Sequence, residues 1–98
     1  MYSLKYLPFV DLDIIEAETY LYEYSPHAVD KLTGAIEKQT TGLKNYPLMY
    51  PVYDERPYYR MMPLPYEYLC FYHVDENSKT VEIHRILRGM RDVTSILQ

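Results

Sequence analysis

The spacing of apolar residues changes along the first part of the chain, and the change separates a strand from a helix. Over residues 2–7 apolar and polar positions alternate, which is typical of a short half-buried strand, and Pro8 ends the run. After that, apolar residues recur at steps of three and four, as on one face of a helix. The buried face of this helix is predicted to comprise Val10, Ile14, Ala17, Leu21 and Tyr24.

The same helix carries only acidic charges. Asp11 or Asp13 can serve as its N-cap, with Glu16 in the capping-box position relative to Asp13. We interpret the acidic side as a solvated face, formed by Asp11, Asp13, Glu16, Glu18 and Glu23.

A second helix is expected immediately after the first. Ser25 is a favourable cap, and Pro26 suits the first helical position, where its missing N–H is not needed. Apolar residues continue at helical spacing to about Gly42, a plausible stop. Two helices joined by so short a break should form an antiparallel hairpin.

The remaining elements are predicted to be mostly strands. Residues 45–65 hold five prolines, which favours an extended loop with at best an edge strand near residues 58–64. Residues 66–74 are almost continuously apolar, as in a central strand buried on both faces, and a polar turn at 75–79 leads into a paired strand at 80–87. Asp92 can cap a last short helix that includes Val93, Ile96 and Leu97.

These elements predict an α+β fold, with a helical hairpin packed on an antiparallel sheet and a short C-terminal helix. The chain has 98 residues, so we expect a single domain over residues 1–98. No apolar run approaches the roughly 18 to 20 residues that span a bilayer, and the N-terminus lacks a secretory signal pattern. The expectation is a cytoplasmic protein without a membrane partner.

Several chemistries have no support in the sequence. Cys70 is the only cysteine and is interpreted as a small buried residue; the three histidines lack metal-site spacing, so no metal is expected. Phosphate-binding glycine motifs are absent, which argues against the common nucleotide enzymes and predicts no cofactor. The net charge of −4 argues against duplex DNA binding. All five arginines lie after residue 55, so an anionic partner should meet the C-terminal half.

Five segments together resemble the RelE/ParE superfamily of type II toxins. They are DLDIIEAETYLYEYSP, the segment 43–47, the pair Tyr59-Arg60, the strand YLCFYHVD and the tail VEIHRILRGMRDV, of which the tail is the most specific. The resemblance spans nearly the whole chain. It implies an intracellular toxin that is silenced by a cognate antitoxin, whose extended, partly helical segment wraps over it.

The family divides into two activities, and the resemblance to the RelE-like branch is incomplete. RelE-like members cleave mRNA on the ribosome, and their first basic cleft residue and a late arginine fall on Arg60 and Arg91. Other functional positions fall on Met62, Leu69 and Leu97, which cannot supply that chemistry. His73 or His84 could act as the base instead, because histidine titrates near neutral pH. If the protein is RelE-like, the resemblance implies Arg60 and Arg91 as catalytic residues, and His73 is the expected base.

ParE-like members inhibit DNA gyrase, and the tail matches this branch better. Arg85, Arg88 and Arg91 are then the expected target-binding residues, spaced three apart and not necessarily on one face. The thirteen tyrosines suit a surface that a partner buries, and we expect Tyr58, Tyr59, Tyr66 and Tyr68 to bind the antitoxin. Stacking on single-stranded RNA is the other interpretation of these tyrosines.

Three functional hypotheses follow. The favoured one is a ParE-like toxin with DNA gyrase as its target. The alternatives are a RelE-like, ribosome-dependent mRNA endonuclease and a non-toxic antitoxin-binding module with a degenerate site.

Overall fold

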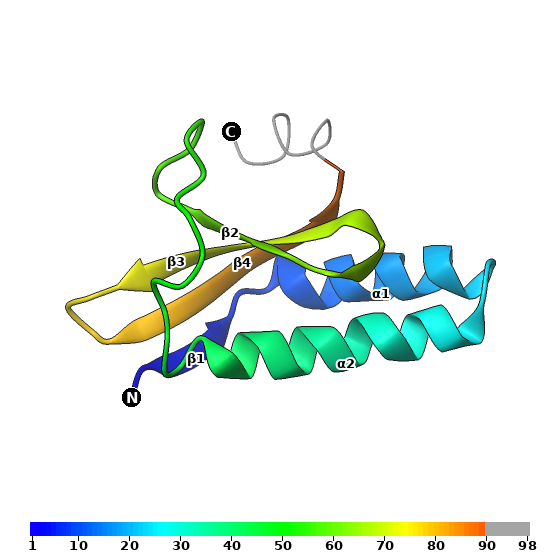
Figure 1. Cartoon of the computed structure of the whole chain (residues 1–98), viewed down its shortest axis with the longest axis horizontal. Helices are drawn as coiled ribbons and strands as arrows, with labels where there is room; N and C mark the ends of the chain where they lie inside the picture. Colours follow the sequence, from blue (N-terminus) through cyan, green and yellow to red (C-terminus); the bar gives the residue numbers. More distant parts are fainter. Residues whose placement is uncertain (90–98) are drawn as a thin grey trace.

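The computed structural model describes residues 1–89, which form two helices against one face of a four-stranded sheet (Figure 1). The C-terminal helix predicted around Val93 to Leu97 lies outside the described residues. No described helix is long and apolar enough to cross a membrane. In chain order the elements are β1 (Ser3–Tyr6), α1 (Phe9–Tyr22), α2 (Pro26–Gly42), β2 (Arg60–Pro63), the short 3-10 helix η1 (Pro65–Glu67), β3 (Tyr68–Asp75) and β4 (Thr80–Arg88).

The two helices match their predicted extents closely, but α1 begins differently from the prediction. The Ser25 hydroxyl accepts a hydrogen bond from the His27 amide and caps α2, as expected. In contrast, α1 follows Pro8 without any side-chain cap, so the capping role predicted for Asp11 or Asp13 is wrong. Tyr24 also lies beyond the end of α1 and is 71% exposed, because the chain has already turned toward α2.

The strand order is β1-β4-β3-β2, and the sheet is mixed, which corrects the antiparallel prediction. The pairs β2–β3 and β3–β4 are antiparallel, whereas β1 lies parallel to β4. The helical hairpin is the cause: α1 continues in the direction of β1 and α2 returns (Figure 1). The strands β2, β3 and β4 then reverse in turn, so β4 again runs in the direction of β1. The predicted edge strand is confirmed as β2.

The central strand β3 is buried on both faces, as its continuous apolar sequence predicts. Cys70 and Tyr72 pack with the helices, and Phe71 packs on the opposite face with Tyr53 and Leu87. Burial raises the pKa of the Cys70 thiol to about 12, so the thiol stays protonated near neutral pH. The interpretation of Cys70 as a small core residue is therefore confirmed.

A bulge interrupts the pairing of β3 with β4. Tyr72 pairs with Ile83 and Phe71 pairs with Arg85, so His84 is the extra residue of β4. Ile83 and Ile86 consequently both reach the core beneath the helices, although strict alternation places residues three apart on opposite faces.

Replacing Tyr72 by Phe tests how the proline-rich loop is held to the sheet. The buried Tyr72 hydroxyl donates a 2.9 Å hydrogen bond to the Pro47 carbonyl. Tyr72→Phe should lower the free energy of unfolding by about 1–2 kcal/mol, because the carbonyl loses its buried donor. Tyr46→Phe is the control, since Tyr46 is 68% exposed. Urea denaturation of both variants gives the comparison, and equal midpoints would contradict the prediction.

Candidate functional site

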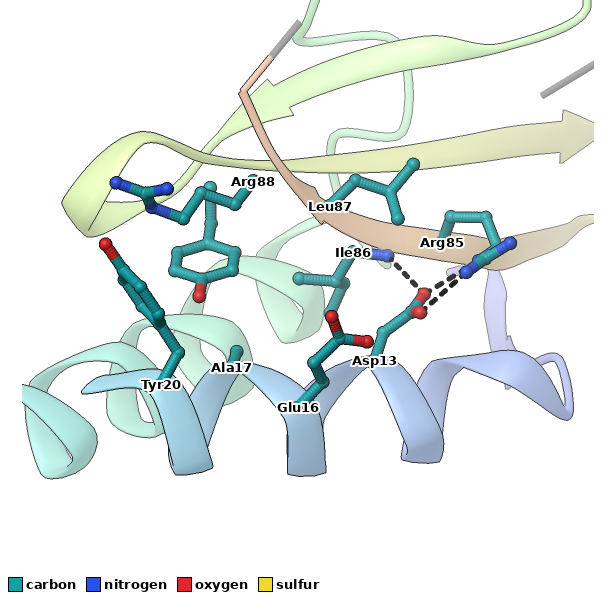
Figure 2. Close-up of a pocket in the computed structure, with 9 residues that line it drawn as sticks. Asp13, Glu16, Ala17, Tyr20, Arg85, Ile86, Leu87 and Arg88 are labelled. Carbon is teal, nitrogen blue, oxygen red and sulfur yellow. Dashed lines mark hydrogen bonds and ion pairs between the residues drawn. The ribbon is translucent and has the colours of Figure 1, made fainter. Parts of the chain in front are cut away.

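A cleft lies between α1 and the second half of β4. The strand β1 ends at Tyr6, whereas β4 continues to Arg88, so α1 takes the place beside β4 that β1 has left. The cleft has a volume of about 200 Å³ (Figure 2). Its walls are formed by Asp13, Glu16, Ala17, Tyr20, Tyr68, Arg85, Ile86, Leu87 and Arg88.

Asp13 joins the two walls of this cleft through three hydrogen bonds. Its carboxylate accepts from Arg85 Nε at 2.8 Å and from Arg85 Nη2 at 2.7 Å, and also from the Ile86 amide at 2.9 Å (Figure 2). Only 6% of Asp13 is exposed, so the ion pair and the amide together compensate the burial of its charge. Asp13 thus binds a backbone N–H of β4 beyond the end of the β1 pairing.

The sequence interpretation placed Asp13 on a solvated acidic face, which is wrong. A signal for burial was present, because Asp13 is three residues after Val10 and four before Ala17, both of which lie on the buried face. Because several exposed positions of the helix are also acidic, Asp13 was interpreted as one of them. Nothing in the sequence identifies its partner, since Arg85 is 72 residues away.

Arg85, which is predicted to bind the target, forms an ion pair with Asp13 inside the protein. Its side chain is 22% exposed, and its guanidinium lies 5.2 Å from the centre of the Phe9 ring. Hydrogen bonding to Asp13 raises the pKa of Arg85 above its ordinary value. Arg85 therefore remains charged and fixed in orientation.

Arg88, in contrast, is exposed and has no ion pair with any residue in the described part of the chain. Its guanidinium lies 4.4 Å from the centre of the Tyr20 ring, an arrangement that leaves donors available (Figure 2). Arg85 and Arg88 line the same cleft, although only Arg88 presents a charge to solvent. Arg91, the third predicted target-binding residue, lies outside the described residues.

Arg60 and His73 come together elsewhere, in a cavity of about 310 Å³ beside the edge strand. Arg60 Nη1 donates to the Tyr50 carbonyl at 2.7 Å, so part of the guanidinium is engaged. The His73 ring stacks on Tyr58 with centroids 3.8 Å apart, and its Nδ1 lies 2.8 Å from the Tyr58 carbonyl oxygen. His84 is nearby, with its ring edge-on to Tyr58 and its Nε2 at 3.1 Å from Glu82 Oε1.

The four tyrosines predicted to bind the antitoxin do not form one surface. Tyr58 is 53% exposed and lies in the cavity with His73, whereas Tyr59 packs against Phe71. Tyr66 is 39% exposed and borders a separate cavity of about 400 Å³ next to Tyr20 and Arg88. Tyr68 is only 4% exposed, so it offers little surface to a partner.

The short 3-10 helix η1 contains two residues with unusual backbone angles. Tyr66 has a φ of 61° and Glu67 a φ of 65°, in the left-handed region that residues with side chains rarely adopt. The turn that they form brings the Gly89 amide to the Glu67 carbonyl, to which it donates a hydrogen bond.

Within residues 1–89, no group of three or more His, Cys, Asp or Glu side chains has a geometry that could hold a metal ion.

Neutralising Asp13 tests whether it holds α1 to β4. Asp13→Asn should lower the free energy of unfolding by about 3 kcal/mol, because the partly buried Arg85 loses its counter-charge. Glu16→Gln is the matched control, since Glu16 lines the same cleft without an ion pair to a described residue, and it should change stability by less than about 0.5 kcal/mol. Chemical denaturation measures both; similar losses for the two variants would refute a special role for Asp13.

Comparison with known proteins identifies the family of this chain. The chain matches the ParDE system of P. aeruginosa with a TM-score of 0.72 and 22% identity, covering 92% of this chain and 98% of that one. It matches the intact E. coli RelBE toxin–antitoxin complex with a TM-score of 0.64 and 13% identity, covering 93% and 100%. At these identities the structural matches establish the fold alone. No curated protein sequence matches the chain. Residues 5–93 match the model of the ParE toxin of the type II toxin–antitoxin system parDE, so the protein belongs to the ParE toxin family.

Proposed function

We propose that this ParE-family toxin arrests growth by inhibiting DNA gyrase and that a cognate antitoxin silences it. The observation that carries the proposal is the family match over residues 5–93, together with an arginine presented at the end of β4. The antitoxin is proposed because similar structures are those of a ParDE system and of the RelBE toxin–antitoxin complex.

The cleft between α1 and β4 supplies the proposed contact with the target. Arg88 stands exposed on Tyr20, and a cation held against an aromatic ring can still donate hydrogen bonds to a partner's carboxylate. Arg85 acts indirectly: its ion pair with Asp13 fixes the strand that carries Arg88. In a chain of net charge −4, such a local positive group favours an acidic patch on the target.

The side chains at two positions where RelE-like members are basic argue against nuclease chemistry. Met62 is fully buried, and Leu69 packs against a hydrophobic cluster, at positions where the resemblance implies basic residues in RelE-like members. RNA cleavage requires proton transfer at two oxygens as well as charge compensation at phosphorus. Arg60 alone can compensate charge but is too basic to transfer protons efficiently.

Truncating Arg88 tests the proposed target contact. Purified Arg88→Ala protein should inhibit gyrase supercoiling about tenfold less than the unmodified protein, because it loses an interfacial arginine. Arg60→Ala is the matched control and should keep full inhibition. Pulse labelling after induction should show an early fall in DNA synthesis for the wild-type chain and for Arg60→Ala. Unchanged supercoiling in the presence of the wild-type protein would exclude gyrase as the target.

The mRNA endonuclease remains a second candidate because Arg60 and His73 line one cavity. This alternative predicts an early fall in protein synthesis and cleavage of ribosome-bound mRNA, both abolished by Arg60→Ala and strongly reduced by His73→Gln. Primer extension on a translated message measures the cleavage. We expect no cleavage, and Arg60→Ala should remain toxic. An absence of any growth effect at confirmed soluble expression would instead favour the non-toxic antitoxin-binding module.

A further inference from the structure

A cavity of about 400 Å³ lies where the turn between α1 and α2 meets η1. Three tyrosines line it, each from a different segment: Tyr20 in α1, Tyr24 in the turn and Tyr66 in η1. Leu21 and Ala28, which are both buried, add apolar surface. We call this cavity the tyrosine pocket. Its volume lies in the range of pockets that bind ligands, so it can admit one large side chain of a partner.

The backbone at Tyr66 is strained, and this strain fixes the residue at the pocket. Tyr66 and Glu67 have φ angles of 61° and 65°, which cost free energy in any residue with a side chain. The Leu64 amide donates to the Tyr68 carbonyl at 2.8 Å, and the Gly89 amide supports the turn from the other side. Glycine adopts such angles without cost, so the backbone gives no reason for a tyrosine. Strained residues of this kind cluster at functional sites, which makes Tyr66 a candidate binding residue.

Positive charges lie beside two of the three rings. The Arg88 guanidinium is 4.4 Å from the centre of the Tyr20 ring, and Lys31 Nζ is 5.8 Å from the centre of the Tyr66 ring. Neither cation forms an ion pair within residues 1–89. Glu67 is the one carboxylate that lines the pocket among the described residues. The rim is therefore more basic than acidic, although the chain as a whole has a net charge of −4.

The tyrosine pocket adjoins the cleft between α1 and β4. Tyr20 and Arg88 line both hollows, so the Arg88 guanidinium stands at the boundary between them. A partner segment whose carboxylate pairs with Arg88 consequently places a neighbouring residue at the mouth of the tyrosine pocket. Aromatic rings and aliphatic side chains both pack well on tyrosine faces and edges.

We propose that the tyrosine pocket receives an aromatic or large aliphatic side chain of the target protein, next to an Asp or Glu that pairs with Arg88. This inference rests on the proposed inhibition of gyrase and adds the chemistry of the segment that is recognised. Tyr66 is then a specificity-determining residue for the target, a different role from the antitoxin contact expected from the sequence. Charge complementarity at Arg88 selects the acidic neighbour, and the three rings select the apolar one.

Tyr66→Gly tests the pocket without disturbing the turn, because glycine suits the positive φ at this position. The variant should inhibit supercoiling by purified gyrase about tenfold less than the unmodified chain, since the pocket loses one ring. Tyr66→Phe keeps the ring and should retain inhibition. Lys79→Gly is the matched control: Lys79 also has a positive φ, of 53°, but lies beyond the opposite end of β4 from Arg88. It should inhibit as the unmodified chain does, and circular dichroism verifies folding.

A double variant tests whether one target segment contacts both Tyr66 and Arg88. If it does, Tyr66→Gly/Arg88→Ala should weaken inhibition about 20-fold rather than the roughly 100-fold expected for two independent contacts. Replacing Tyr66 by p-benzoyl-phenylalanine and irradiating the complex with purified gyrase should crosslink the two proteins. Mass spectrometry should then find a large apolar residue beside an Asp or Glu at the crosslinked site.

The possible contrary results separate this proposal from the proposed function. Full inhibition by Tyr66→Gly would exclude the pocket as a target contact and leave gyrase as the target. Supercoiling that the unmodified chain does not inhibit would refute both. Weaker antitoxin binding by Tyr66→Gly, with gyrase inhibition unchanged, would assign the pocket to the antitoxin instead. A dimer in light scattering that only Tyr66→Gly dissociates, again with inhibition unchanged, would identify a second copy of this chain as the occupant.

Discussion

The position of α1 against the sheet depends on the buried carboxylate of Asp13. Asp13 accepts two hydrogen bonds from Arg85 and one from the Ile86 amide, and so it joins α1 to β4 where β1 no longer reaches. Burying an aspartate is costly unless its charge is paired and its oxygens are hydrogen-bonded, and here both conditions are met. The position of α1 along β4, and with it the cleft between them, follows from this contact.

The same contact divides the roles of the two described arginines at the end of β4. Arg85 is held by Asp13 and acts as part of the scaffold, whereas Arg88, three residues later, lies exposed on Tyr20. The bulge at His84 contributes by letting Ile83 and Ile86 both enter the core around this region. A strand end that presents the exposed Arg88 guanidinium suits recognition of a partner better than proton transfer, because arginine is too basic to transfer protons efficiently.

The two faces of α1 are specialised in opposite ways. The inner face combines apolar residues with Asp13. The outer face combines exposed apolar residues with acidic residues that form no ion pair within residues 1–89. On the proposed function, the basic end of β4 meets the target, and the acidic outer face of α1 lies on a different element.

Local features of the sequence determined the helix extents, the Ser25 cap, the buried central strand and the burial of Cys70, because each depends on neighbours within a few residues. The resemblance in the tail also indicated the family. Tertiary structure alone decided the parallel pairing of β1 with β4, the ion pair between Asp13 and Arg85, and the meeting of Arg60 with His73. The physical reason is separation along the chain: Asp13 and Arg85 are 72 residues apart, and only folding decides whether a carboxylate faces water or a guanidinium.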